Sequence, residues 1–207
     1  MNVQSKQEEL AKLQERVRQL EQDLSHEKPP APWQPTGFYT AYYATTGFML
    51  GMFAAVASLL FNVVGSLLVG KHPLELIRIY LTFPMGEKAL DLNAVDGGLT
   101  LVIGCCLYLG TGMLLGVPFY LALALLTPRS TFGRRMVVAT VLSVLVWLVN
   151  YYAILSWLQP ALFGGNWIVE LIPWWVAALT HLVFGWTMVL VYPLGTFTPQ
   201  RYGSEQS

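Results

Sequence analysis

Four long stretches of the chain contain no Asp, Glu, Lys or Arg: residues 29–70, 97–128, 136–169 and 171–200. Each can hold a helix of about 20 apolar residues, the length needed to cross a hydrocarbon layer roughly 30 Å thick. Charge at the centre of a bilayer is costly, so its absence from these windows favours lipid as the solvent of the helices. The sequence therefore predicts an all-α integral membrane protein built as a four-helix transmembrane bundle.

Composition supports this class of protein. Charged residues make up 12% of the 207 residues, whereas a soluble domain has roughly 25%. The formal net charge of zero gives no support to binding of nucleic acid, so the expected partner is the lipid bilayer. The two cysteines, Cys105 and Cys106, are adjacent within an apolar run and cannot build the disulfide framework of a small secreted protein.

Residues 1–28 have the heptad pattern of a coiled-coil helix. The predicted apolar seam consists of Val3, Leu10, Leu13, Val17, Leu20 and Leu24. Val17 at the first core position and Leu20 at the second suit a parallel two-stranded coil, and Arg16 and Glu21 occupy the flanking positions that pair between chains. Three interpretations stay open: a solvated amphipathic helix, self-association, and pairing with a helix of another membrane subunit.

A linker rich in proline and aromatic residues, 29–43, is expected to lead into a transmembrane domain over residues 44–193. Its aromatic residues are of the kind found at the level of lipid headgroups. A polar C-terminal tail is expected at 194–207. The four spans are expected at about 44–69, 98–126, 136–158 and 173–193.

A different element is predicted at residues 73–83. Glu75, Arg78 and Thr82 are spaced three and four apart, so they share one helical face, while apolar residues cover the other. The pattern is typical of an interfacial helix lying flat on the outer membrane surface with its polar face in water. Binding of a headgroup or partner by Glu75 and Arg78 is the alternative.

Basic residues predict the orientation of the chain. With four spans, both termini and the turn at 127–135 lie on one side of the membrane, and that side carries nine of the 12 Lys and Arg residues. These nine are Lys6, Lys12, Arg16, Arg18, Lys28, Arg129, Arg134, Arg135 and Arg201. Because positive residues stay cytoplasmic, we expect a multi-pass protein of the inner (plasma) membrane with both termini in the cytoplasm.

Small residues mark the faces on which the helices are expected to pack. Gly47 and Gly51 in the first span, and Gly112 and Gly116 in the second, are each separated by four positions, and Gly185 lies on the fourth span. Glycines at this spacing let two membrane helices approach backbone to backbone. They predict a compact bundle.

Depth along the spans predicts where polar side chains meet. At about 1.5 Å per residue, four polar residues lie roughly 10–12 Å below the outer boundary of their spans: His181, Asn150, Asn62 and Cys105. We expect a polar layer in the outer half of the bundle, centred on His181 with Asn62 and Asn150 as hydrogen-bond partners and Tyr108 near enough to add a hydroxyl. The layer either fixes helix order or forms a functional site around an ionisable residue.

No cofactor is predicted, although haem, copper or quinone binding at the polar layer stays open because imidazole can ligate a metal or bind a proton. A bis-histidine haem is disfavoured, since His26 and His72 lie outside the layer. The sequence contains no phosphate-binding glycine loop, no helical pair of metal-binding histidines and no serine nucleophile elbow. Catalytic and metal-ligating residues are therefore not assigned, and an enzyme is not favoured.

The leading hypothesis is a non-catalytic accessory, scaffolding or assembly subunit of a larger membrane complex, with a respiratory complex among the candidates. It follows from the association helix, the glycine-lined faces and the lack of catalytic motifs. One alternative is a redox or quinone- or lipid-binding protein that uses the layer around His181. Another is a small-solute transporter or channel, although the spans carry no ionisable residue suited to coupling except His181.

Overall fold

The protein is described by a computed structural model that is helical throughout its described part and contains no strand there. The described residues are 3–26, 36–68, 70, 72–91, 98–128 and 130–196. The chain divides into two compact units, residues 1–37 and 38–207.

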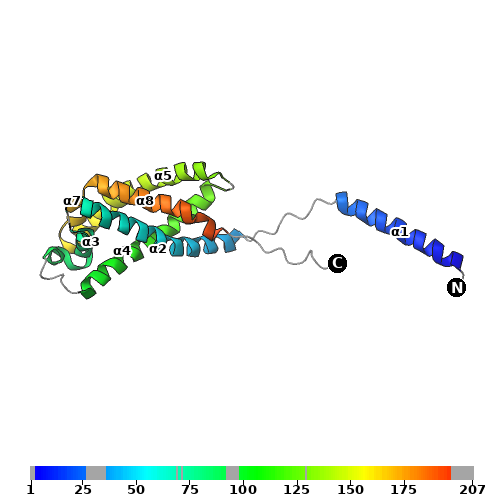
Figure 1. The fold of residues 1–207 in the computed structure, drawn as a ribbon, viewed down its shortest axis with the longest axis horizontal. Helices are drawn as coiled ribbons and strands as arrows, with labels where there is room; N and C mark the ends of the chain where they lie inside the picture. Colours follow the sequence, from blue (N-terminus) through cyan, green and yellow to red (C-terminus); the bar gives the residue numbers. More distant parts are fainter. Residues whose placement is uncertain are drawn as a thin grey trace. The chain divides into compact units, whose positions relative to one another are not determined.

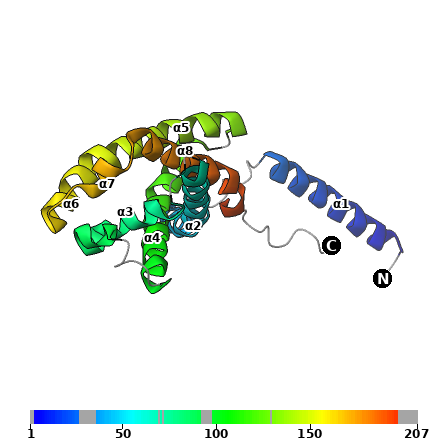
Figure 2. The same cartoon turned by 60° about the vertical axis from the view of Figure 1, so that its left-hand side comes forward.

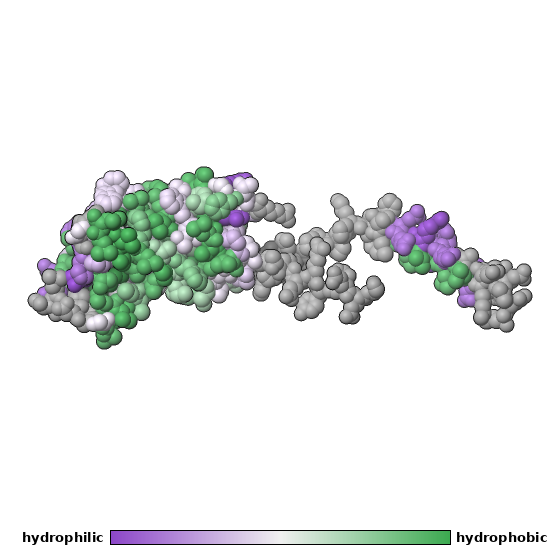
Figure 3. All heavy atoms as spheres, viewed as in Figure 1, coloured by the Kyte–Doolittle hydropathy of each residue, from purple (hydrophilic) through white to green (hydrophobic). Residues whose placement is uncertain are grey.

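The first unit contains one helix, α1 (Val3–His26), drawn in blue in Figure 1. Leu10, Leu13, Val17 and Leu20 lie on one face of this helix, and their side chains are 49% to 61% exposed. Hydrophobic and hydrophilic side chains occupy different sides of α1 (Figure 3). The side chains of Val3 and Leu24, the two ends of the predicted seam, lie outside the described residues.

The second unit is built from four long helical segments (Figures 1 and 2). They are α2 (Thr36–Leu68), α4 (Gly98–Leu126), α5 (Phe132–Leu148) with its continuations η2 (Val149–Leu155) and α6 (Ser156–Phe163), and α8 (Trp174–Val191), which continues into η3 (Tyr192–Gly195). The shorter elements are α3 (Glu75–Met85), η1 (Gly86–Leu90) and α7 (Trp167–Leu171). In both views α3 and α7 lie at the same end of the unit.

Four helices are long and apolar enough to cross a membrane, as predicted. They are Thr40–Leu68, Leu101–Leu126, Phe132–Phe163 and Trp174–Gly195. Large apolar side chains cover their outer surface, which is green over most of the face seen in Figure 3. Soluble monomers rarely expose apolar patches larger than a few hundred Å², so this surface has the character of a multi-pass membrane protein.

The third long segment is longer than the predicted span of 136–158. It runs from Phe132 to Phe163 and contains the π-helical turns of η2. A π-helical turn adds a residue to the helix, which rotates the side chains that follow around the helix axis. Such turns are frequent at functional sites. The segment ends at Gly164, whose φ of 80° is the left-handed conformation that glycine adopts without strain.

The prediction that Thr82 lies on a water-facing side of α3 is wrong. Thr82 is fully buried, and so are Ile77 and Leu81. Gly104 of α4 makes room for this packing, because a Cβ added there would lie 2.6 Å from Cγ2 of Ile77. Ile79 belongs to a second buried cluster formed with η2, α7 and the start of α8. Helix α3 is therefore covered by protein on more than one side, while Glu75 and Arg78 are half-buried.

Helices α2 and α4 cross at the four glycines singled out in their sequences. A Cβ added to Gly47 would lie 2.6 Å from the carbonyl oxygen of Gly116, and one added to Gly51 would lie 2.5 Å from that of Gly112. The two backbones are thus in direct contact at this crossing. Gly185 of α8 packs in the same way against Ser143 and the backbone of α5.

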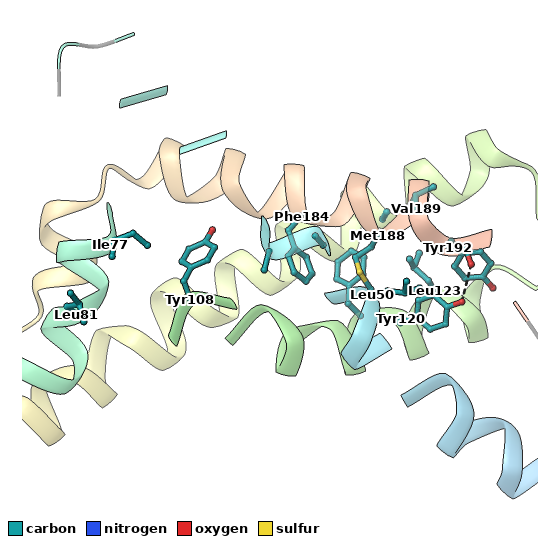
Figure 4. Packing of buried hydrophobic residues seen from close by; sticks show 14 of the residues in the cluster. Leu50, Ile77, Leu81, Tyr108, Tyr120, Leu123, Phe184, Met188, Val189 and Tyr192 are labelled. Atoms are coloured by element: carbon teal, nitrogen blue, oxygen red, sulfur yellow. Dashed lines mark hydrogen bonds between the residues drawn. The ribbon is translucent and has the colours of Figure 1, made fainter. Parts of the chain in front are cut away.

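An aromatic and aliphatic core fills the end of the bundle opposite α3. Tyr120, Met188 and Tyr192 pack together there, and the Tyr120 hydroxyl donates a hydrogen bond of 3.2 Å to the backbone oxygen of Tyr192 (Figure 4). The guanidinium carbon of Arg135 lies 4.0 Å from the centre of the Tyr192 ring, a cation–π contact that ties α5 to η3.

Candidate functional site

A chain of hydrogen bonds joins three helices in the interior of the second unit. The Ser58 hydroxyl of α2 lies 2.9 Å from the Tyr108 hydroxyl of α4. One turn along α2, Asn62 Nδ2 donates to Thr180 Oγ1 of α8 at 2.9 Å and to the backbone oxygen of Ser58 at 2.7 Å. Thr180 Oγ1 also lies 3.1 Å from Asn62 Oδ1. Asn62 and Ser58 are buried, so these bonds satisfy groups that water does not reach.

His181 joins α8 to the π-helical segment. Its Nδ1 lies 2.8 Å from the backbone oxygen of Ala177, and its Nε2 lies 3.4 Å from Nδ2 of Asn150. A carbonyl only accepts, so Nδ1 carries the proton, and Nε2 of the neutral ring accepts from the amide of Asn150. Among the described residues no hydrogen bond reaches Asn150 Oδ1, which leaves an acceptor at this position.

The two networks line one small cavity of about 80 Å³. Its polar walls are formed by Ser58, Tyr108, Thr111, Asn150, Thr180 and His181. Space of this size holds a few water molecules when polar groups surround it. The lining contains no carboxylate, lysine or arginine, so the cavity offers neutral hydrogen-bonding groups and one imidazole.

Tyr80 of α3 closes one side of this cavity. Its ring meets the Tyr108 ring edge to face, with 5.1 Å between centroids. Burial raises the pKa of the Tyr80 hydroxyl above its ordinary value, and a hydrogen bond with Thr111 opposes that effect. The hydroxyl is therefore neutral, like the rest of the lining.

A second polar cluster holds α3 and α7 against the third long segment. Gln159 of α6 is fully buried. Its Nε2 donates to Thr82 Oγ1 at 2.9 Å, and its Oε1 accepts from the backbone N–H of Ile168 at 2.9 Å. The Tyr151 hydroxyl lies 2.7 Å from the backbone oxygen of Val169. Since Tyr151 and Ile168 line the cavity, this cluster fixes its wall.

The structure brings together most of the predicted polar layer, with two corrections. Asn62 bonds to Thr180 and not to His181 itself. Cys105 does not line the cavity; it is half-buried and packs against the hydrophobic core. Counting residues along a helix gives the depth of a side chain and not the direction in which it points, which explains the error at Cys105.

Several lining residues were missed by sequence reasoning. Thr180 directly precedes His181, and its hydroxyl lies 2.8 Å from the backbone oxygen of Val176, four residues earlier. A single threonine in an apolar helix gave no separate signal in the sequence. Tyr80 was missed because α3 was expected on the membrane surface, and with it Thr111 of α4, which lines the cavity beside Tyr80. Thr82 and Gln159 were missed as a pair because 77 positions separate them.

Metal-binding residues do not gather in the described part of the chain: no three His, Cys, Asp or Glu side chains come together there in a group that could hold an ion. The site is defined instead by neutral polar side chains around a cavity. Comparison of the chain with known protein families, with curated proteins and with solved structures finds no match.

Proposed function

We propose that the protein is a non-catalytic accessory or scaffolding subunit of a larger complex in the inner membrane, of which a respiratory complex is one candidate. The four apolar helices anchor it in lipid, and α1 joins it to its partners. The observation that carries this proposal is the exposed apolar face of α1.

The apolar face of α1 is suited to another helix. Leu10, Leu13, Val17 and Leu20 repeat at coiled-coil spacing and are 49% to 61% exposed. Fully burying one such side chain contributes about 1.5–3 kcal/mol, whereas a free helix of this length is only marginally stable in water. A second copy of the chain or a helix of another subunit would supply the missing contacts.

The proposed topology places both termini and the α4–α5 turn in the cytoplasm. Arg134 and Arg135 at the start of α5 support it, because basic residues stay on the cytoplasmic side. A membrane-impermeant maleimide tests it on a chain with Cys105 and Cys106 replaced by alanine. Ser130→Cys should be labelled only after the cells are opened, and Glu87→Cys in intact cells; the reverse pattern would overturn the orientation.

Gentle extraction tests the functional proposal. In mild detergent we expect a particle larger than one 23.1 kDa chain plus its detergent. Leu13→Glu places a charge in the apolar face and should reduce the particle mass. The matched control Gln19→Glu adds the same charge to another exposed part of α1 and should not. A wild-type chain that is a lone monomer at cellular concentration would end the proposal.

A further inference from the structure

The apolar stripe of α1 is narrow. It consists of Leu10, Leu13, Val17 and Leu20, whose side chains are 49% to 61% exposed. The other described side chains of this helix are polar or charged. A stripe confined to two positions in every seven is the seam of a coiled coil, whereas a helix that packs on a broad protein surface has a wider apolar face. The natural occupant of this stripe is another helix.

A lipid surface fits α1 less well. Helices that lie on a membrane are rich in basic residues on the polar face and carry aromatic residues on the apolar one. The described side chains between Glu9 and Gln22 include three acidic and three basic residues and no aromatic residue. This part of the helix therefore has no net charge to attract anionic lipid and no aromatic anchor.

The residues that flank the stripe are complementary to a second copy of the same helix. In a parallel two-stranded coil, a residue that precedes a first core position lies beside the partner residue five positions further along the sequence. Arg16 and Glu21 have this separation, so two copies in register form the ion pair twice. By the same rule Glu9 lies beside Gln14, and no like charges meet among the described residues.

An antiparallel pair of copies loses this complementarity. If Leu10 packs against Leu20 of the second copy, and Leu13 against Val17, then Arg16 lies beside Arg16 of the second copy. Like charges placed together in an interface oppose association. Val17 at a first core position, with leucine at the second, also favours two strands over three or four.

We infer that α1 joins two copies of this chain in a parallel, in-register, two-stranded coiled coil, a step that rests on the proposed function, in which α1 is the element of association. A free helix of this length is only marginally stable in water. Two copies anchored in one bilayer meet at a higher effective concentration than free helices do. The coil is therefore tested in the full chain.

Disulfide formation in native membranes tests the orientation. Leu20→Cys is introduced into a chain whose Cys105 and Cys106 are replaced by alanine, and the membranes are oxidised with copper phenanthroline. In the parallel coil the two new cysteines face each other across the seam, so we expect a disulfide-linked dimer. Gln19→Cys, an exposed position outside the stripe, is the matched control and should stay monomeric.

An antiparallel coil gives a different product. It would link a copy carrying Leu10→Cys to a copy carrying Leu20→Cys, two positions that the parallel coil separates by about 15 Å along the helix axis. That mixed product, without the dimer of Leu20→Cys alone, would overturn the parallel arrangement. Equal yields from Leu20→Cys and Gln19→Cys would overturn the coil.

A charge exchange tests whether the partner is a second copy, and it needs no change in the stripe. Two differently tagged copies are expressed together, extracted in mild detergent and pulled down through one tag. With Arg16→Glu in both copies, or Glu21→Arg in both, like charges meet twice, and we expect co-purification to fall about threefold or more. With Arg16→Glu in one copy and Glu21→Arg in the other, opposite charges meet twice, and co-purification should return to the wild-type value.

The outcomes separate this inference from the proposed function. If the particle is larger than one chain but the tagged copies do not co-purify, or the charge exchange restores nothing, the partner is another protein. The inference then falls while the scaffolding role stands. If the wild-type chain is a lone monomer, both fall.

Discussion

The contact between α2 and α4 makes a sharp prediction for Gly51. A methyl group added by Gly51→Ala would lie 2.5 Å from the carbonyl oxygen of Gly112, which is 0.9 Å short of the 3.4 Å at which ordinary contact begins. The next nearest atoms, at 3.0 and 3.1 Å, are Cα atoms of α4. No flexible side chain can move aside, so the two helices must separate. Overpacking of this kind costs about 1–3 kcal/mol.

Gly65 supplies the control on the same helix. Alanine raises helix propensity by about 1 kcal/mol at either position, but at Gly65 its methyl meets nothing within 4 Å. The difference between the two alanine variants therefore isolates the helix contact.

The free energy of unfolding in mixed micelles, measured by titration with SDS, gives that difference. We expect Gly65→Ala to be as stable as the wild type or more stable, and Gly51→Ala to be less stable than Gly65→Ala by about 1–3 kcal/mol. Two variants that agree within roughly 0.5 kcal/mol, the range of changes that touch nothing, would refute the backbone contact between α2 and α4.

Three further outcomes are expected from the polar contacts and the apolar face of α1. Gln159→Leu leaves the buried N–H of Ile168 without its acceptor and should lower the free energy of unfolding by about 1–3 kcal/mol in the same titration; an unchanged value would contradict the assigned bond. A double-mutant cycle of Asn62→Ala and Thr180→Ala should give a coupling of about 0.6 kcal/mol, the average for such bonds in membranes, and zero coupling would argue against it. Leu13→Glu should leave the melting temperature of the second unit unchanged in a thermal scan, and a large shift would contradict the division into two units.

The long helices were predictable because one physical constraint acts on every residue of a span. A charge within the hydrocarbon layer is costly wherever it points, so charge-free windows locate the helices without knowledge of their packing. The contact between α2 and α4 was also predictable, because the small size of Gly51 and Gly112 marks the helix faces on which they lie as packing faces. The extension of the third segment to Phe163 was not, since nothing in residues 149–155 of the sequence marked the π-helical turns that the structure has there.

The position of α3 could not be read from its own pattern. Spacing places Glu75, Arg78 and Thr82 on one face, but spacing does not say what covers that face. Thr82 is buried because Gln159, far along the chain, satisfies its hydroxyl, and Ile77 fits because Gly104 lacks a side chain. Such long-range compensation overrides local amphipathicity.

The depth of the polar layer could be predicted from the sequence, but the pairing of its side chains could not. Depth along each helix brought Asn62, Asn150 and His181 to a common level. In the structure Asn150 and His181 line the polar cavity, and Asn62 bonds to Thr180 in its wall. The pairing depends on rotation about each helix axis, which residue counts do not give. Rotation directs Asn62 to Thr180 and turns Cys105 towards the hydrophobic core.

Site-specific photo-crosslinking in intact membranes tests the association role of α1 most directly. A benzophenone amino acid replaces Leu13 on the apolar face or Gln19 elsewhere on the exposed surface of the helix, and the products are identified by mass spectrometry. We predict a discrete crosslink from position 13 to a second copy or to a subunit of a membrane complex, and none from position 19. Equal yields at both positions, or no product at position 13, would contradict the account.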